Sequence, residues 1–226
     1  MSKYEKLWKY ISTQEENFLT LTFNQVEQIA GVPIDHSFLK YKAELLEFGW
    51  VVKKIHMKEQ TVDFTEAWDA YDSNFQKIEG TVLLRTDKVP DGMFHLVVSV
   101  MLKHTDGTYL LMQRDLQKSN GGKWDFTAIG SAKAGESAEQ AAKRELAEET
   151  GIICTELCQI DRAVRNEIHM IIIDYFGTTN CDKSSVVLQK GETIAYKWIT
   201  REELEKLDAS ELQATFERDL VIKKGL

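Results

Sequence analysis

The stretch from Gly130 to Ile152 constrains this chain more than any other, because it combines a well-marked helix with a dense block of glutamates. Ser137, followed three residues later by Gln140, predicts that the helix begins with a capping box. Glycine is the usual residue just beyond the last turn of a helix, so we expect this helix to end at Gly151.

Three glutamates of this helix share one face. Glu145, Glu148 and Glu149 stand at i, i+3 and i+4, which brings their carboxylates together within a single turn. A solvated acidic face is the ordinary explanation of such a pattern. Like charges at this spacing repel one another, however, and hard divalent cations prefer carboxylate oxygens. The spacing alone leaves both explanations open.

The whole stretch resembles the signature of the Nudix hydrolases, G-x5-E-x7-R-E-U-x-E-E-x-G-U, in which U is an aliphatic residue. All fixed positions of the signature are matched, by Gly130, Glu136, Arg144, Glu145, Leu146, Glu148, Glu149, Gly151 and Ile152. The resemblance implies hydrolysis of the diphosphate linkage in a nucleoside diphosphate joined to another group X. It also implies Mg²⁺, or Mn²⁺ as an alternative, which neutralises the diphosphate and lowers the pKa of an attacking water.

The resemblance also implies roles for residues of the signature. Glu145, Glu148 and Glu149 match the family's metal ligands, and the carbonyl of Gly130 is a further candidate, since backbone oxygens suit hard cations. Arg144 is expected to orient the carboxylates rather than to touch the substrate. Together with Glu192, discussed next, these residues make up the predicted catalytic group: Glu145, Glu148, Glu149, Glu192 and Arg144.

Outside the signature, four residues are candidates for the same site. Glu192 lies six residues before Trp198 and resembles the family's late acidic residue, which closes the metal site or takes a proton from the water. Arg114, Lys118 and Lys123 are candidates for binding the substrate's phosphates, with an ordinary surface charge as the alternative for each.

Composition excludes several classes of protein. The net charge of −8 over 226 residues argues against a general nucleic-acid binder. The charged N-terminus predicts no signal peptide, and the longest apolar stretches are too short to span a membrane. The three cysteines are odd in number and lack the spacing of a zinc site, which favours reduced thiols in a cytoplasmic protein.

Two modules are expected, at residues 1–75 and 76–226, because arginine is absent before Arg85. The predicted fold class is α+β: a Nudix α/β/α sandwich with a mixed sheet, preceded by a small helix-helix-hairpin domain that is winged-helix-like. In the first module we expect three helices, at Tyr4–Ile11, Phe23–Ala30 and Ser37–Phe48. A hairpin of Trp50–Ile55 and Gln60–Phe64 is expected next, followed by a helical connector at Thr65–Lys77.

The first module also raises the hypothesis of a regulator that binds a nucleotide and reads DNA. Against it, the candidate recognition helix contains Glu44 and Glu47, and the module has no arginine to neutralise phosphates. Leu21–Phe64 also resembles an uncharacterised small bacterial domain, which implies no activity. The role of the module stays open.

The second module resembles the Nudix branch related to isopentenyl-diphosphate isomerase, over roughly Thr81–Leu204. Strands are expected at Thr81–Arg85, His95–Lys103, Tyr109–Gln113, Leu157–Ala163, Ile168–Phe176 and Thr193–Ile199, and a last helix at Ala209–Lys224. The isomerase chemistry uses a cysteine near the start of the signature, where this chain has Thr127-Ala128-Ile129. A hydrolase is therefore the preferred hypothesis, and a homodimer is left open.

Overall fold

The computed structural model describes residues 3–14 and 16–226, and the chain divides into two compact units. The first unit contains Met1–Leu96 and two later segments, Ala132–Glu136 and Asn166–Ile171. The second unit contains the rest of the chain. The predicted division at residues 75 and 76 stays a prediction, because compactness does not show that either part folds without the other.

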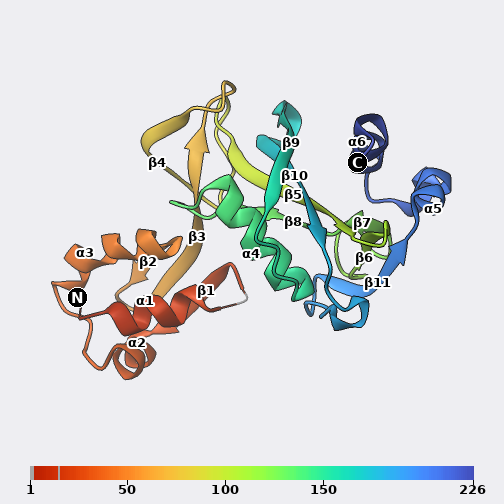
Figure 1. The fold of residues 1–226 in the computed structure, drawn as a ribbon. Coiled ribbons are helices and arrows are strands. Elements are labelled where there is room, and N and C mark those ends of the chain that lie inside the picture. The colour runs from red at the N-terminus through yellow and green to blue at the C-terminus, as the bar shows by residue number, and fades with distance from the viewer. Residues whose placement is uncertain (1–2, 15) are drawn as a thin grey trace. The chain divides into compact units, whose positions relative to one another are not determined.

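The first unit is built on a four-stranded sheet with β3 at its centre (Figure 1). Strands β1 and β2 flank β3, and β4 pairs with the later part of β3. The elements of this unit, in chain order, are α1 (Glu5–Ser12), β1 (Phe18–Thr22), α2 (Phe23–Ala30), α3 (Phe38–Tyr41), the 3₁₀ helix η1 (Lys42–Phe48), β2 (Trp50–His56), β3 (Thr61–Tyr71) and β4 (Lys77–Leu84).

The predicted helices of the first unit are confirmed with small changes. Helix α1 begins and ends one residue later than expected, and α2 has the expected bounds. Thr22 and Gln25 form a capping box at the start of α2, and Gly31 ends it in the left-handed conformation at φ 75°. The third helix consists of four α-helical residues followed by seven 3₁₀ residues, and Gly49 ends it at φ 77°.

The prediction of a helical connector at Thr65–Lys77 is wrong. Strand β3 continues to Tyr71, and β4 then pairs with it, with Ala67 opposite Leu84. The middle of β3 is buried on both faces. This part of the strand therefore lacks the polar–apolar alternation that identifies a strand from sequence. Strand β1 was also missed, although the predicted hairpin of β2 and β3 is confirmed.

An aromatic core holds the first unit together. Tyr4, Trp8, Phe38 and Trp50 are fully buried, and the rings of Tyr4 and Phe38 meet edge to face at 5.1 Å. This core packs α1, α2 and α3 against β2 and β3.

The second unit contains a seven-stranded mixed sheet in the order β11-β6-β5-β10-β9, with β7 beside β6 and β8 beside β5. Helix α4 packs against β8 and β9 (Figure 1). Helices α5 and α6 share an apolar cluster with β5, β6, β7 and β11. The elements are β5 (His95–His104), β6 (Tyr109–Arg114), β7 (Trp124–Phe126), β8 (Ala128–Ser131), α4 (Ala138–Thr150), β9 (Leu157–Arg165), η2 (Asn166–Ile168), β10 (Met170–Thr179), η3 (Lys183–Ser185), β11 (Thr193–Ile199), α5 (Arg201–Lys206), η4 (Ala209–Glu211) and α6 (Phe216–Lys224).

The predicted α+β class is confirmed, and one helix of the second unit is corrected. The last helix was expected from Ala209 but begins at Phe216. Leu212 is extended instead, at ψ 146°, and forms a parallel bridge with Trp124, so the chain leaves the helical path between the two segments. Within residues 3–14 and 16–226, no helix has the length and apolar character needed to cross a membrane.

Candidate active site

Helix α4, which contains the three glutamates, is fixed at both ends as the sequence predicts. The Ser137 side chain accepts a hydrogen bond from the Gln140 backbone at 3.2 Å, and the Gln140 side chain accepts one from the Ser137 backbone at 2.9 Å. Gly151 ends the helix at φ 71°. The glutamate face therefore belongs to a helix with a defined start and end.

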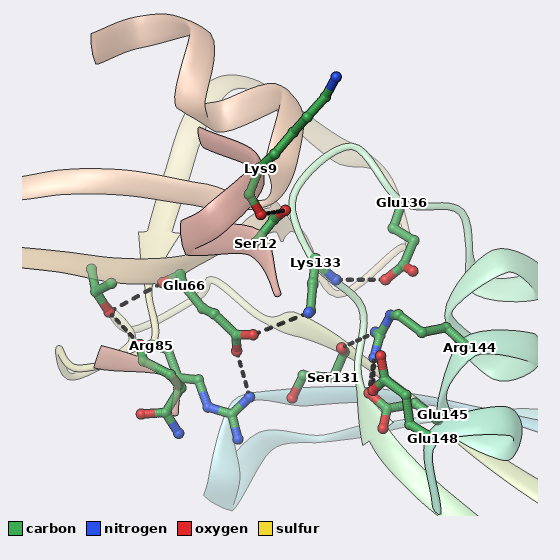
Figure 2. Close-up of polar contacts among 12 residues, drawn as sticks. Lys9, Ser12, Glu66, Arg85, Ser131, Lys133, Glu136, Arg144, Glu145 and Glu148 are labelled. Carbon is green, nitrogen blue, oxygen red and sulfur yellow. Dashed lines mark hydrogen bonds and ion pairs between the residues drawn. The ribbon is translucent and has the colours of Figure 1, made fainter. Parts of the chain in front are cut away.

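Arg144 holds two of the three glutamates (Figure 2). Its guanidinium donates to Glu145 at 2.8 Å and to Glu148 at 3.1 Å. It also donates to the backbone carbonyl of Ser131, at 3.1 Å, so the helix is tied to the end of β8. The arrangement is the one expected of a residue that orients carboxylates, because the charged fork faces acids of its own helix.

The backbone of Gly130 lies against the carboxyl group of Glu145. A Cβ atom at this position would stand 2.0 Å from the carboxyl carbon of Glu145, far inside contact distance. Only glycine therefore allows the Glu145 carboxylate and the Gly130 backbone of β8 to approach this closely. The structure thus brings together two residues that the sequence predicts as candidate ligands.

Glu149 is the most buried of the three glutamates, with 7% of its surface exposed. Burial raises its pKa well above the usual value, and the negative charges of Glu145 and Glu192 raise it further. A backbone hydrogen bond from Ile129 acts in the opposite direction. Glu149 is therefore a carboxyl group surrounded by other acids, and its ionised form is disfavoured.

Glu192 and Lys118 form an ion pair, in which each side chain is about one-third exposed. The backbone carbonyl of Glu192 also accepts a hydrogen bond from the backbone of Asp115 at 2.8 Å. Glu192 also lies near enough to Glu149 for its negative charge to raise the pKa of Glu149. Lys118, a predicted phosphate-binding residue, is the direct partner of the predicted late acidic residue.

The two other predicted phosphate-binding residues differ in their surroundings. Arg114 is mostly buried and donates to Asp125 at 3.2 Å and to the Ser119 carbonyl at 3.1 Å. Lys123 lies in the turn before β7, is partly exposed, and uses its backbone carbonyl to accept from Arg114. The structure brings Arg114 and Lys123 together through this turn.

Three buried acids of the second unit were missed by the sequence analysis: Asp125, Asp174 and Glu217. Burial, joined by the charge of Glu217, raises the pKa of Asp125 to about 6 and that of Asp174 to about 7. Burial also raises the pKa of Glu217. Among the described residues, neither carboxyl oxygen of Asp174 has a partner within strict hydrogen-bond geometry, although the nearby Ser99 and Arg165 side chains lower its pKa in part. The signal was a single acid within an apolar strand, as in Ile171–Phe176.

The acidic side chains fit a hard divalent cation in their chemistry. In the part of the chain that the structure describes, no three His, Cys, Asp or Glu side chains lie close enough together to hold a metal ion as they stand. The available donors are nevertheless all oxygen, and Glu149 is buried among like charges that a cation would offset. The residues that would hold the ion are Glu145, Glu148, Glu149 and the Gly130 carbonyl.

Comparison with known proteins identifies relatives of this chain. The family model of the NUDIX domain matches residues 93–220. An uncharacterised Nudix hydrolase of Listeria monocytogenes is 34% identical over 147 residues, which cover 64% of this chain and 86% of that protein. An isopentenyl-diphosphate Delta-isomerase of Photobacterium profundum is 34% identical over 125 residues, or 51% of this chain and 69% of the isomerase.

A crystal structure of a Deinococcus radiodurans protein shows the same fold. It is 20% identical to this chain, with a TM-score of 0.56, and the match covers 70% of this chain and 98% of that one.

Proposed function

The chain belongs to the Nudix hydrolase family, and from this premise we propose that it cleaves the diphosphate linkage of a nucleoside diphosphate joined to another group X. The observation that supports this best is Glu149, which is 7% exposed and lies among other acids within a complete signature. A buried acid in such surroundings is costly for a protein that does not bind cations.

The proposed cofactor is Mg²⁺, with Mn²⁺ as an alternative, in keeping with the general use of divalent metal ions by Nudix hydrolases. Glu145, Glu148, Glu149 and the Gly130 carbonyl would hold it. When bound, such an ion neutralises diphosphate oxygens and lowers the pKa of a water that attacks phosphorus. Zn²⁺ is expected to substitute poorly, because the proposed ligands include neither His nor Cys.

The chain's own residues divide the remaining work. Arg144 fixes the directions of Glu145 and Glu148 through its two hydrogen bonds. Glu192 is proposed to accept the proton of the attacking water. Lys118, which pairs with Glu192, is proposed to exchange that carboxylate for a substrate phosphate. Arg114 and Lys123 are proposed to bind the same phosphates from the turn before β7. Asp125 holds Arg114 in place for this role.

An isopentenyl-diphosphate isomerase is the second candidate, because one relative with that name is 34% identical over 125 residues. The position expected to hold the isomerase cysteine lies at Thr127-Ala128-Ile129. Thr127 is fully buried, and its hydroxyl donates to the Leu110 carbonyl and accepts from the Leu102 backbone, both at 3.1 Å. Its hydroxyl is thus engaged by the backbone, which favours hydrolysis over isomerisation.

We further propose a cytoplasmic enzyme whose residues 1–75 form a separate module, with a homodimer left as a question for solution experiments. Its three cysteines are free, as expected of a reducing compartment. A nucleotide-sensing regulator is the less favoured hypothesis, because the signature is complete.

The direct test is a panel of nucleoside diphosphate derivatives incubated with the full chain and Mg²⁺, followed by phosphatase-coupled phosphate release. We expect at least one derivative to be hydrolysed, activity to vanish on exhaustive chelation, and Mg²⁺ or Mn²⁺ to restore it. Full activity after chelation contradicts the proposal. Isopentenyl diphosphate in the same panel, with its isomer measured, separates the second candidate.

A further inference from the structure

The loop Ala132–Glu136 connects the two parts of the signature. It follows Ser131 at the end of β8, which contains Gly130, and it precedes Ser137, the N-cap of α4. Although it is part of the signature, the loop belongs to the first compact unit together with β3. Its conformation therefore depends on residues far earlier in the chain.

Strand β3 makes three successive contacts with this loop. The Ala134 backbone donates to the Ala67 carbonyl at 2.8 Å. The Gly135 backbone donates to the Asp69 carboxylate at 3.0 Å. The Lys133 ammonium lies 3.3 Å from the Glu66 carboxylate (Figure 2). Three neighbouring loop residues are thus each held by one residue of β3.

The contacts are formed by acids that are themselves held in place. Glu66 is 6% exposed and also pairs with Arg85 at 2.8 Å, while Asp69 also pairs with Lys77 at 2.8 Å. Each acid therefore has one cation from the β4 side and one partner from the loop. An acid fixed by a first partner loses less side-chain freedom when it binds a second one.

The loop is also tightly packed and internally braced. A Cβ atom at Gly49 would lie 2.8 Å from the Lys133 Cβ, so the backbone passes close to the loop there. Within the loop, the Glu136 carboxylate accepts a hydrogen bond from the Lys133 backbone at 2.9 Å. Glu136 is a fixed position of the signature, and this contact gives it a role in shaping the loop.

We infer that Glu66 and Asp69 of β3 are positioning residues for the active site, acting through the loop Ala132–Glu136. The inference rests on the proposed hydrolase function. The loop sets where β8 ends and where α4 begins, and hence how Gly130 and the glutamate face are presented. Although residues 1–75 are proposed as a separate module, Glu66 and Asp69 of that module would then also set the geometry of the active site.

The tether is tested by amide hydrogen exchange at Ala134 and Gly135 in the full chain, with no substrate or metal added. In Asp69→Ala the Gly135 amide loses its acceptor, so its exchange is expected to rise about tenfold or more, as in local opening. Asp87→Asn removes an ion pair of the same unit, with Lys53, that does not involve the loop, and it serves as the control. Unchanged exchange in both Asp69→Ala and the milder Asp69→Asn overturns the tether.

The consequence for catalysis is tested by a double-mutant cycle of Glu66→Gln and Lys133→Met, read as kcat and KM separately. If Glu66 acts through Lys133, each single variant should lower kcat roughly 10- to 100-fold with a smaller change in KM, and the double variant should be no worse than the singles. Additive losses, or a normal kcat in Glu66→Gln, overturn the positioning role. An intact chain that hydrolyses nothing in the panel instead contradicts the proposed function, and the exchange measurement still decides the tether.

Discussion

Two glutamates of this molecule are equally buried and have opposite surroundings. Glu66 of the first unit is 6% exposed and contacts two cations, Arg85 and Lys133. Glu149 of the second unit is 7% exposed, and the charges with the largest influence on it are those of other acids. The first pattern is that of a structural ion-pair network, and the second is the charge environment of the proposed metal site.

The same contrast extends beyond these two residues. Asp69 in the first unit is paired with Lys77. In the second unit, the negative charges of Glu217 and Asp161 raise the pKa of the buried Asp174. The residue type alone, Asp or Glu, does not reveal this difference in surroundings. What distinguishes a structural acid from a functional one is the sign of the charge that the fold places beside it.

The largest expected effect that tests this contrast is that of Glu149→Gln. Because the substitution removes a proposed metal ligand, we expect kcat to fall on the order of 10³-fold, or about 4 kcal/mol of barrier, and the Mg²⁺ requirement to rise. In metal-free protein the same change should raise Tm. The wild type loses stability as pH rises above the usual carboxyl pKa, since its folded state retains the proton, and glutamine does not titrate.

Glu66→Gln is the matched comparison, because its burial is the same. It should lower Tm in metal-free protein, since the buried carboxylate is the shared partner of two cations. If both variants shift Tm in the same direction, the contrast between the two glutamates is wrong. Calorimetry or thermal circular dichroism with a chelator present measures it.

The next largest effect is expected from Glu192→Gln. If Glu192 is the general base, kcat should fall at least about 10²-fold, within the range of 10²–10⁴ typical of such residues, while the Mg²⁺ requirement barely moves. Lys118→Met is the control, because it breaks the same ion pair and leaves the carboxylate in place. A near-normal kcat in Glu192→Gln excludes it as the base, and the search then passes to Asp125, or to Asp161 and Glu167.

Much of the second unit was predictable because its signals are local. The capping box of Ser137, the stop at Gly151 and the bounds of β11 all follow from neighbouring residues. The one-face arrangement of Glu145, Glu148 and Glu149 follows from helical periodicity alone. The family resemblance then supplied the chemistry that spacing could not decide.

What the sequence could not reveal depends on contacts between distant residues. The strand character of Thr65–Tyr71 arises from pairing with distant residues, chiefly those of β4. In sequence, Glu66 resembles an exposed helical acid, and only the structure shows that it pairs with Arg85 and Lys133. The burial of Asp125 and Glu217 is likewise invisible in a local window, whereas that of Asp174 is signalled by its apolar strand. These misses fall where polar residues are buried, which is where the candidate functions lie.

The smallest of the expected effects concerns Asp174, which represents the unpaired acids of the second unit. Its pKa is raised to about 7, by burial first and by the charge of Glu217 next, so the folded state retains a proton that the unfolded state loses. Wild-type stability should therefore fall as pH rises from about 4 to 7. Asp174→Asn does not titrate, so it should be more stable than wild type at pH 8, by on the order of 2 kcal/mol, and near parity at pH 4. Urea unfolding at the two pH values measures the difference.

Asp182→Asn is the control, because the Ser184 backbone donates a hydrogen bond to Asp182 and lowers the pKa of that carboxyl group. Loss of this carboxylate should not stabilise the protein at pH 8. An Asp174→Asn gain that is the same at both pH values would show that packing, not an unpaired charge, sets the stability at this position.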